Sequence, residues 1–166
     1  MGGTASLSQM TDPYTKLIPM ACAIEVKETS GSREEATIQF GVWAAAGLAK
    51  VRGLFNGATL LQPFLGWTVV GHNWMLYMSW KLDNREVVSL RTPAIILSIE
   101  LINMQVVCGP WKAFDAGTDT YRGIFKLLHL IAEVGQWLQK EYWTWFSDGI
   151  VKAEQYDIRG RRGRNT

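Results

Sequence analysis

The sequence has little of what builds disulfide frameworks, zinc sites or a strong electrostatic field. Its 166 residues include only two cysteines and five prolines, and the net charge is +2. Cys22 and Cys108 are isolated from one another and from any histidine, so they give no zinc spacing. We expect both to be buried free thiols. A charge this small gives no argument for nucleic-acid binding from the overall field.

Several catalytic motifs and targeting signals are also missing. The chain has no glycine-rich phosphate loop, no dinucleotide fingerprint and no serine nucleophile elbow. No hydrophobic N-terminal signal is present, which favours an intracellular location, cytoplasmic or nuclear. The uncharged stretch between Arg52 and Lys81 is long enough to span a bilayer. Turn-forming residues divide it into short apolar runs, so we predict buried strands and no contact with a membrane.

Tryptophan, in contrast, is abundant. Eight tryptophans occur in a chain that is 48% hydrophobic and 19% charged, and this length suits one domain with a substantial core. Some of the tryptophans exceed what two helices and a small sheet need to cover. We therefore expect a homodimer that buries part of this set between subunits. The set consists of Trp111, Trp137, Trp143 and Trp145.

A predicted strand near the start of the chain carries an acid and a lysine two residues apart. Residues 20–27 suit an extended segment, in which alternate side chains point to opposite faces. Glu25 and Lys27 then share one face, which is otherwise lined by small side chains. The other face is apolar and consists of Met20, Cys22, Ile24 and Val26.

A helix is predicted to follow this strand, from residue 33 to residue 54 or 55. Ser32 is its candidate N-cap, and Glu35 is the matching capping-box partner. Gln39 and Trp43 are four residues apart and therefore lie on one side of the helix. The face expected to pack on a sheet consists of Ile38, Val42, Ala45, Ala46 and Ala49.

An E-x-K strand end followed by a helix with Q-x-x-x-aromatic resembles the PD-(D/E)xK nuclease superfamily. The closer resemblance is to the fungal PD-(D/E)xK nuclease-like domain family. The chain would be either a typical member of that family or a truncated or degenerate one. The matching stretches are 18–27, which ends in Ile-Glu-Val-Lys, and 36–43, with Ala-x-x-Gln-apolar-x-x-Trp. Residues 67–74 and 141–146 fit the same family, so the resemblance covers most of the chain.

The resemblance implies a site that hydrolyses phosphodiester bonds with a hard cation, Mg²⁺ or Mn²⁺. In the superfamily an Asp and the Glu of E-x-K hold the metal, and the Lys orients or activates the attacking water. Glu25 would be the metal ligand and Lys27 the water-orienting residue, with Gln39 supporting the water or a phosphate oxygen. Asp12 is the candidate for the second metal ligand, but its Asp-Pro order reverses the usual Pro-Asp. If Asp12 does not serve, the usual metal Asp is missing.

Other polar residues have weaker claims to a role. His72, in a Gly-His-Asn turn, could act as a general base, although a satisfied turn histidine is commoner. His129 lies in an apolar helical pattern and is expected to pack. Three acids could be accessory groups, with a solvated role favoured: Glu34, Glu35 and Glu100.

The middle of the chain is predicted to supply the other strands of the sheet. Strands at 66–70 and 75–81 flank a turn at 71–73, and the second of them is apolar on both faces, as in a central strand. A strand at 86–90 and one or two strands within 94–107 follow.

A second long helix is predicted from Tyr121 to about Phe146, after a loop at 115–119 and with Thr118 or Asp119 as its cap. The element order β-α-β-β-β-α indicates an α+β fold, a mixed sheet with a long helix on each side. The resemblance implies the same restriction-endonuclease-like core.

The predicted organisation is a flexible arm over 1–15, a nuclease-like domain over 16–149 and a basic tail over 150–166. Two hypotheses of function remain open. The first is a metal-dependent nuclease acting on nucleic acid. The second is a repurposed nuclease fold without that activity, either a small-molecule biosynthetic enzyme with an aromatic-rich cavity or an interaction module. Low positive charge favours an apolar ligand or partner over a long duplex.

Overall fold

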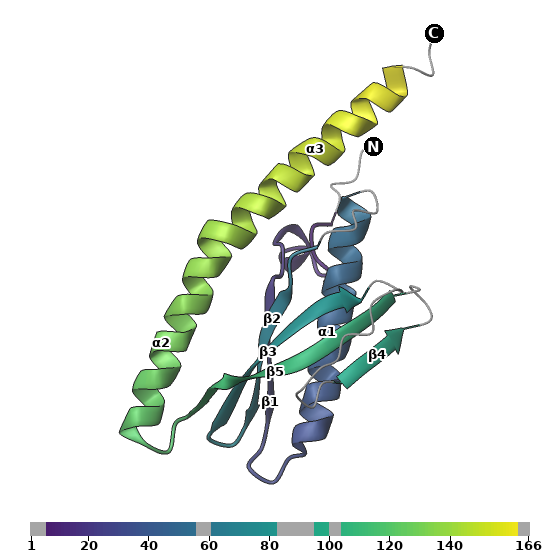
Figure 1. Ribbon diagram of the computed structural model, residues 1–166. Coiled ribbons are helices and arrows are strands. Elements are labelled where there is room, and N and C mark those ends of the chain that lie inside the picture. Colours follow the sequence, from purple (N-terminus) through teal and green to yellow (C-terminus); the bar gives the residue numbers. More distant parts are fainter. Residues whose placement is uncertain (1–5, 56–60, 83–94, 100–103, 163–166) are drawn as a thin grey trace.

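In the part of the chain that the structure describes, a mixed five-stranded sheet carries helices on both faces (Figure 1). The computed structural model describes residues 6–55, 61–82, 95–99 and 104–162. The strand order is β1-β2-β3-β5-β4, in which β1 is parallel to β2 and the other neighbours are antiparallel. The predicted α+β class is confirmed. The strands are β1 (Cys22–Lys27), β2 (Phe64–Val70), β3 (Asn73–Leu82), β4 (Ile95–Ile99) and β5 (Met104–Gly117).

A tight turn joins β2 and β3, as the Gly-His-Asn sequence predicted. Gly71 has a φ of 57°, a left-handed conformation that glycine adopts without steric cost. A Cβ at this position would also lie 2.9 Å from the Thr29 hydroxyl, so the turn has no room for a side chain. The predicted central position of β3 is confirmed, since it lies between β2 and β5.

One face of the sheet is covered by α1 (Arg33–Leu54), whose bounds agree with the prediction. The Ser32 hydroxyl caps the helix by accepting a hydrogen bond from the Glu35 amide at 3.2 Å. Phe40, Ala44 and Leu48 are buried against the sheet in the cluster that contains Phe64 and Tyr77. These apolar side chains hold α1 over β1, β2 and β3.

The predicted packing face of α1 was wrong in part. Ile38 and Val42 are exposed, whereas Ala36 and Phe40 are completely buried. The helix is apolar on nearly every side, so helical spacing alone did not select the face that meets the sheet. The ring of Phe40 fixes that face, because it packs over Gly66 of β2.

The opposite face of the sheet carries a long helical segment that begins after β5. It consists of α2 (Tyr121–Trp137), a π-helical turn (Leu138–Tyr142) and α3 (Trp143–Arg162). Leu127 and Leu130 of α2 pack on Trp67 and Leu76 of the sheet. Figure 1 shows α2 and α1 on opposite sides of the strands, as predicted.

Three predictions about this segment were wrong. Its N-cap is Thr120, whose hydroxyl accepts from the Gly123 amide at 3.0 Å, in place of Thr118 or Asp119. Strand β5 continues to Gly117, where a loop had been expected. The helix continues past Phe146 to Arg162, so the first part of the predicted tail is helical.

Beyond the π-helical turn, the helix packs on the end of α1. Tyr142 and Phe146 are buried in a cluster with Val51 and Ala21. Burial in this apolar cluster raises the pKa of Tyr142 to about 12. The partly buried tryptophans Trp137 and Trp145 join the same cluster. These two indoles therefore have packing partners within one chain, and the expected homodimer stays a prediction.

Some predicted features lie outside the described residues. They include the strand at 86–90, Glu100, and the side chains of Cys108 and Trp111. Cys22 is a free thiol, half-buried, and burial raises its pKa to about 11. Among the described residues, no helix is both long and apolar enough to cross a membrane.

Candidate active site

Glu25 and Lys27 lie on the side of β1 that faces α1. In the parallel register, Glu25 pairs with Thr68 and Lys27 with Val70 at the ends of the two strands. Both side chains are about one-fifth exposed, at 21% and 20%. The strand therefore presents its acid and its lysine together at the edge of the helix-covered face.

The turn between β1 and α1 brings the start of the helix against Lys27. The Gly31 amide donates to the Glu28 carbonyl at 2.8 Å, which closes the turn. A Cβ at Gly31 would lie only 2.6 Å from the Cβ of Lys27. Glycine at this position thus permits the close approach, and Ser32 then starts the helix that carries Glu35 and Gln39.

Four side chains meet around the contact between the Glu35 carboxylate and the Lys27 ammonium group. Lys27 Nζ lies 2.9 Å from Glu35 Oε1 and 3.6 Å from Glu25 Oε1. Gln39 Nε2 donates to the same Glu35 oxygen at 3.1 Å. We name these four residues the polar cluster. The structure thereby brings together all three residues predicted as catalytic, with Glu35 as the link between them.

Glu35 is the residue whose role the sequence analysis missed. The sequence assigned it to a capping box and offered an accessory role with a solvated one favoured, but only its amide takes part in the cap. Its carboxylate, 57% exposed, accepts from Lys27 and Gln39. The four-residue spacing between Glu35 and Gln39 was a usable signal, because it places both on the side of the helix that faces Lys27.

The hydrogen bond from Lys27 to Glu35 raises the pKa of the lysine, and the charges of Glu35 and Glu25 add to this effect. The amine is therefore a protonated ammonium at neutral pH. As an ammonium it donates hydrogen bonds and carries positive charge, and it has no lone pair for taking a proton.

Asp12 lies away from the polar cluster, and its carboxylate stabilises the turn that it begins. Its carboxylate accepts from the amides of Tyr14 and Thr15, at 3.1 and 2.9 Å, and from the Thr15 hydroxyl. Gln9, three residues before Asp12, approaches Gly47, which lies twelve residues along α1 from Glu35. Twelve residues of α-helix span about 18 Å.

A family model described as the PD-(D/E)XK nuclease superfamily matches residues 3–143. The chain belongs to this superfamily. The match covers most of the sequence and includes both β1 and the whole of α1. A search of curated proteins and a search of solved structures each gave no match.

The residues expected to hold a superfamily metal fit that task only in part. Within the described part of the chain, the charged partner of Glu25 is Lys27, at a distance beyond a good hydrogen bond, so the Glu25 carboxylate retains capacity for a cation. Glu35 shares that neighbour and provides a second carboxylate nearby. Asp12 does not fit, because its oxygens cap their own turn. The described residues contain no group of three or more potential metal ligands.

The remaining candidates take no part in the polar cluster. His72 Nδ1 lies 2.8 Å from the Thr118 hydroxyl, a contact that ties the β2–β3 turn to the end of β5. His129 is exposed on α2, so the prediction that it packs was wrong. Glu34 is exposed in the first turn of α1, in agreement with the solvated role favoured for it.

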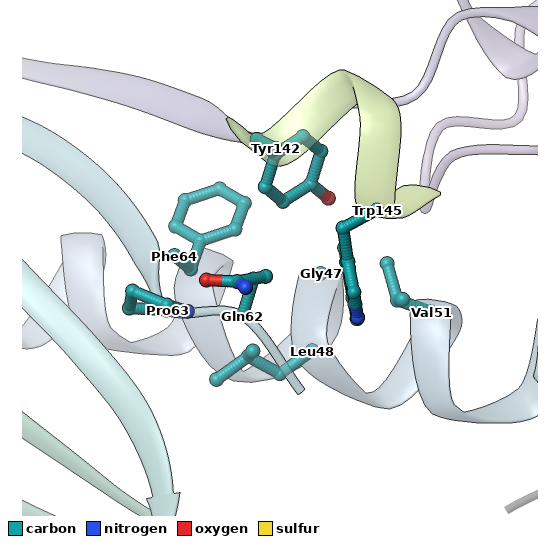
Figure 2. A pocket seen from close by; sticks show the side chains of 8 residues that line it. All are labelled: Gly47, Leu48, Val51, Gln62, Pro63, Phe64, Tyr142 and Trp145. Atoms are coloured by element: carbon teal, nitrogen blue, oxygen red, sulfur yellow. The ribbon is translucent and has the colours of Figure 1, made fainter. Parts of the chain in front are cut away.

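A small hollow lies at the other end of α1, away from the polar cluster. Its walls come from α1, the start of β2, the π-helical turn and the first turn of α3, and they leave no enclosed space large enough for a water molecule. Figure 2 shows the side chains of Gln62, Phe64, Tyr142 and Trp145 around it. The hollow combines aromatic walls with the amide of Gln62.

Proposed function

We propose that this chain is a metal-dependent nuclease-like hydrolase that cleaves phosphodiester bonds of nucleic acid. One observation carries the proposal: Glu25, Lys27 and Gln39 meet on the helix-facing side of β1 through Glu35. They meet in a chain of the PD-(D/E)XK nuclease superfamily. The proposal assigns Glu25 to the metal and Lys27 to the attacking water.

The cation would be Mg²⁺ or Mn²⁺, and Glu25 and Glu35 are the residues that would hold it. One or two carboxylates completed by water and substrate phosphate are typical of Mg²⁺ sites. When bound, the metal would neutralise the charge that develops on the phosphate and would activate a water.

Lys27 acts in this proposal as a fixed positive charge. Glu35 and Glu25 hold its ammonium in place, and the ammonium donates hydrogen bonds to the attacking water or a phosphate oxygen. Gln39 donates to Glu35 and so limits the rotation of that carboxylate. The raised pKa of Lys27 favours orientation of the water over removal of its proton.

A cleavage assay on single- and double-stranded DNA with Mg²⁺ or Mn²⁺ tests the proposal. We expect cleavage by the unmodified chain and its loss in Lys27→Ala and Glu25→Ala. Lys126→Ala is the matched control, because Lys126 also pairs with a carboxylate, Asp115 at 3.1 Å, but lies on α2. Absence of metal-dependent cleavage by a folded unmodified chain would contradict the proposal.

The second candidate function is a repurposed fold that binds a small apolar ligand or partner. The aromatic hollow between α1 and the π-helical turn favours it. The surrounding side chains leave no room even for a water molecule, so a small group would bind there only if Tyr142 or Trp145 moved. Ligand-induced thermal shifts that disappear in Trp145→Ala, in a chain that cleaves no DNA, would support this function.

A further inference from the structure

Strand β1 forms one edge of the sheet. It is the first strand in the order β1-β2-β3-β5-β4, and within the described residues it pairs on one side only, with β2. The backbone amides and carbonyls that point away from β2 are therefore available along Cys22–Lys27. Such an edge is a template for pairing with another strand.

The side chains of β1 leave this edge apolar on its outer face. Ile24 is 56% exposed and Val26 is 64% exposed, on the face opposite α1. Ile18, just before the strand, is also exposed. Charged side chains commonly protect edge strands from association. Here Glu25 and Lys27 turn toward α1 and pair within the polar cluster, so they give the outer face no such protection.

The adjoining side of α1 becomes apolar beyond the polar cluster. Glu35 and Gln39 mark the stripe of α1 that faces the β1 edge, because they reach Lys27. Val42 and Trp43 follow on the next turn beside this stripe, and both are exposed, at 55% and 41%. Apolar surface thus borders the free backbone edge on both faces of the sheet.

We propose that two copies of this chain associate through their β1 edges, antiparallel about a two-fold axis at Ile24. The two sheets then form one continuous sheet, and the two α1 helices lie side by side on the same face. In this arrangement Ile24 meets its own counterpart, and Val26 meets the partner's Cys22. Val42 and Trp43 face the other α1.

The sequence of β1 is self-complementary in this register along most of the strand. With the axis at Ile24, Glu25 and Lys27 lie opposite the partner's Ala23 and Ala21, whose small side chains leave room for them. An axis at Glu25 would place two carboxylates opposite one another, which is destabilising. An axis at Val26 would place Glu25 opposite the partner's Lys27, but it would pair only residues 25–27 of the strand, because β1 ends at Lys27. A two-fold partner of identical sequence therefore fits the edge.

The competing apolar surface lies on α2. Its exposed side chains include Phe125, Leu128 and Ile131, and Leu128 is 57% exposed. A helix satisfies its backbone hydrogen bonds internally, so this surface offers side chains alone. The β1 edge offers backbone hydrogen bonds and apolar side chains together, and for that reason we assign the interface to β1.

Sedimentation velocity and light scattering over roughly 1–100 μM test this interface. We expect a particle of twice the 18.7 kDa chain mass for the unmodified protein. Ile24→Lys should shift it to the monomer mass, because two ammonium groups would oppose each other at the axis. Leu128→Lys is the control, with matching exposure on α2, and should leave the dimer intact. Circular dichroism verifies that each variant is folded.

Cysteine crosslinking tests the register and does not depend on the lysine variant. In a Cys22→Ser, Cys108→Ser background, Ile24→Cys should form disulfide-linked dimers at the axis, and Val26→Cys should form them at least tenfold more slowly. A monomeric unmodified protein would overturn the proposal. A dimer that dissociates in Leu128→Lys and persists in Ile24→Lys would overturn it too, as would faster crosslinking at position 26.

Discussion

Lys27 lies closer to Glu35 than to the Glu of its own E-x-K motif. The Nζ atom is 2.9 Å from the Glu35 carboxylate and 3.6 Å from that of Glu25. The lysine is thus held mainly by the first turn of α1, and Glu25 keeps the weaker contact. This asymmetry leaves Glu25 as the carboxylate with more capacity for another cation.

We expect Glu35→Gln to lower the pKa of Lys27. The substitution removes both the charge and the strongest acceptor that raise the pKa of the ammonium. Titration of the Lys27 side chain by NMR measures the change. Glu34→Gln, in the same helical turn but outside the polar cluster, should leave the titration unchanged. Equal shifts in the two variants would show that general charge, and not the hydrogen bond, controls Lys27.

Substitution of Asp12 and substitution of Glu25 should have different effects on Mn²⁺ binding. Asp12→Ala removes the acceptor for two amides of its turn and should cost about 1 kcal/mol of unfolding free energy. It should not change Mn²⁺ affinity, whereas Glu25→Ala should abolish binding. Calorimetric titration and denaturant unfolding measure the two quantities. A loss of affinity in Asp12→Ala equal to that in Glu25→Ala would contradict the placement of Asp12.

Gly66→Ala should destabilise the fold through its contact with Phe40. A Cβ at position 66 would overlap the Phe40 ring and lie 2.6 Å from the Ala23 carbonyl oxygen. We expect a loss of about 1–3 kcal/mol, typical of overpacked cores. Gly135→Ala is the control, since nothing lies within 4 Å of a Cβ there. It should stabilise α2 by about 0.5–1 kcal/mol. Chemical denaturation measures both changes.

Stability should fall between about pH 10 and pH 12 because of Tyr142. The unfolded phenol loses its proton near pH 10, and burial raises the folded pKa to about 12. Over this interval the unfolded state binds fewer protons, so rising pH favours unfolding by about 2–3 kcal/mol in total. Below pH 10 the contribution is complete. Tyr142→Phe should show a smaller decline in denaturant unfolding across the same interval, and an unchanged decline would contradict the assignment.

The sequence predicted those parts of the fold that short-range chemistry determines. Ser32 marks the start of α1, and Gly71 needs the left-handed conformation of the β2–β3 turn. The buried face of α1 was missed, because Ile38 and Val42 are as apolar as the residues that do pack. Which side of an apolar helix is covered depends on the tertiary position of the sheet, and spacing carries no information about that direction.

The candidate site was also predicted in part: its three main residues were identified, but the central contact with Glu35 was not. Period-two alternation placed Glu25 and Lys27 on one face, and the family resemblance linked Gln39 to them. The length of the turn before α1, and the close approach allowed by Gly31, decide which helical residue meets Lys27. That contact falls to Glu35, eight residues along the chain, and a sequence pattern does not contain this distance.

The π-helical turn at Leu138–Tyr142 allows one continuous helix to pack on both the sheet and the end of α1. In a regular helix of roughly 3.6 residues per turn, Phe146 would point about 100° away from Leu127. Yet Leu127 packs on the sheet and Phe146 packs on the end of α1. A π-bulge adds about one residue to a turn, and one residue is about 100° of rotation. The π-helical turn thus removes the rotational offset of about 100°. One continuous helix can therefore direct Leu127 toward the sheet and Phe146 toward α1 from the same side.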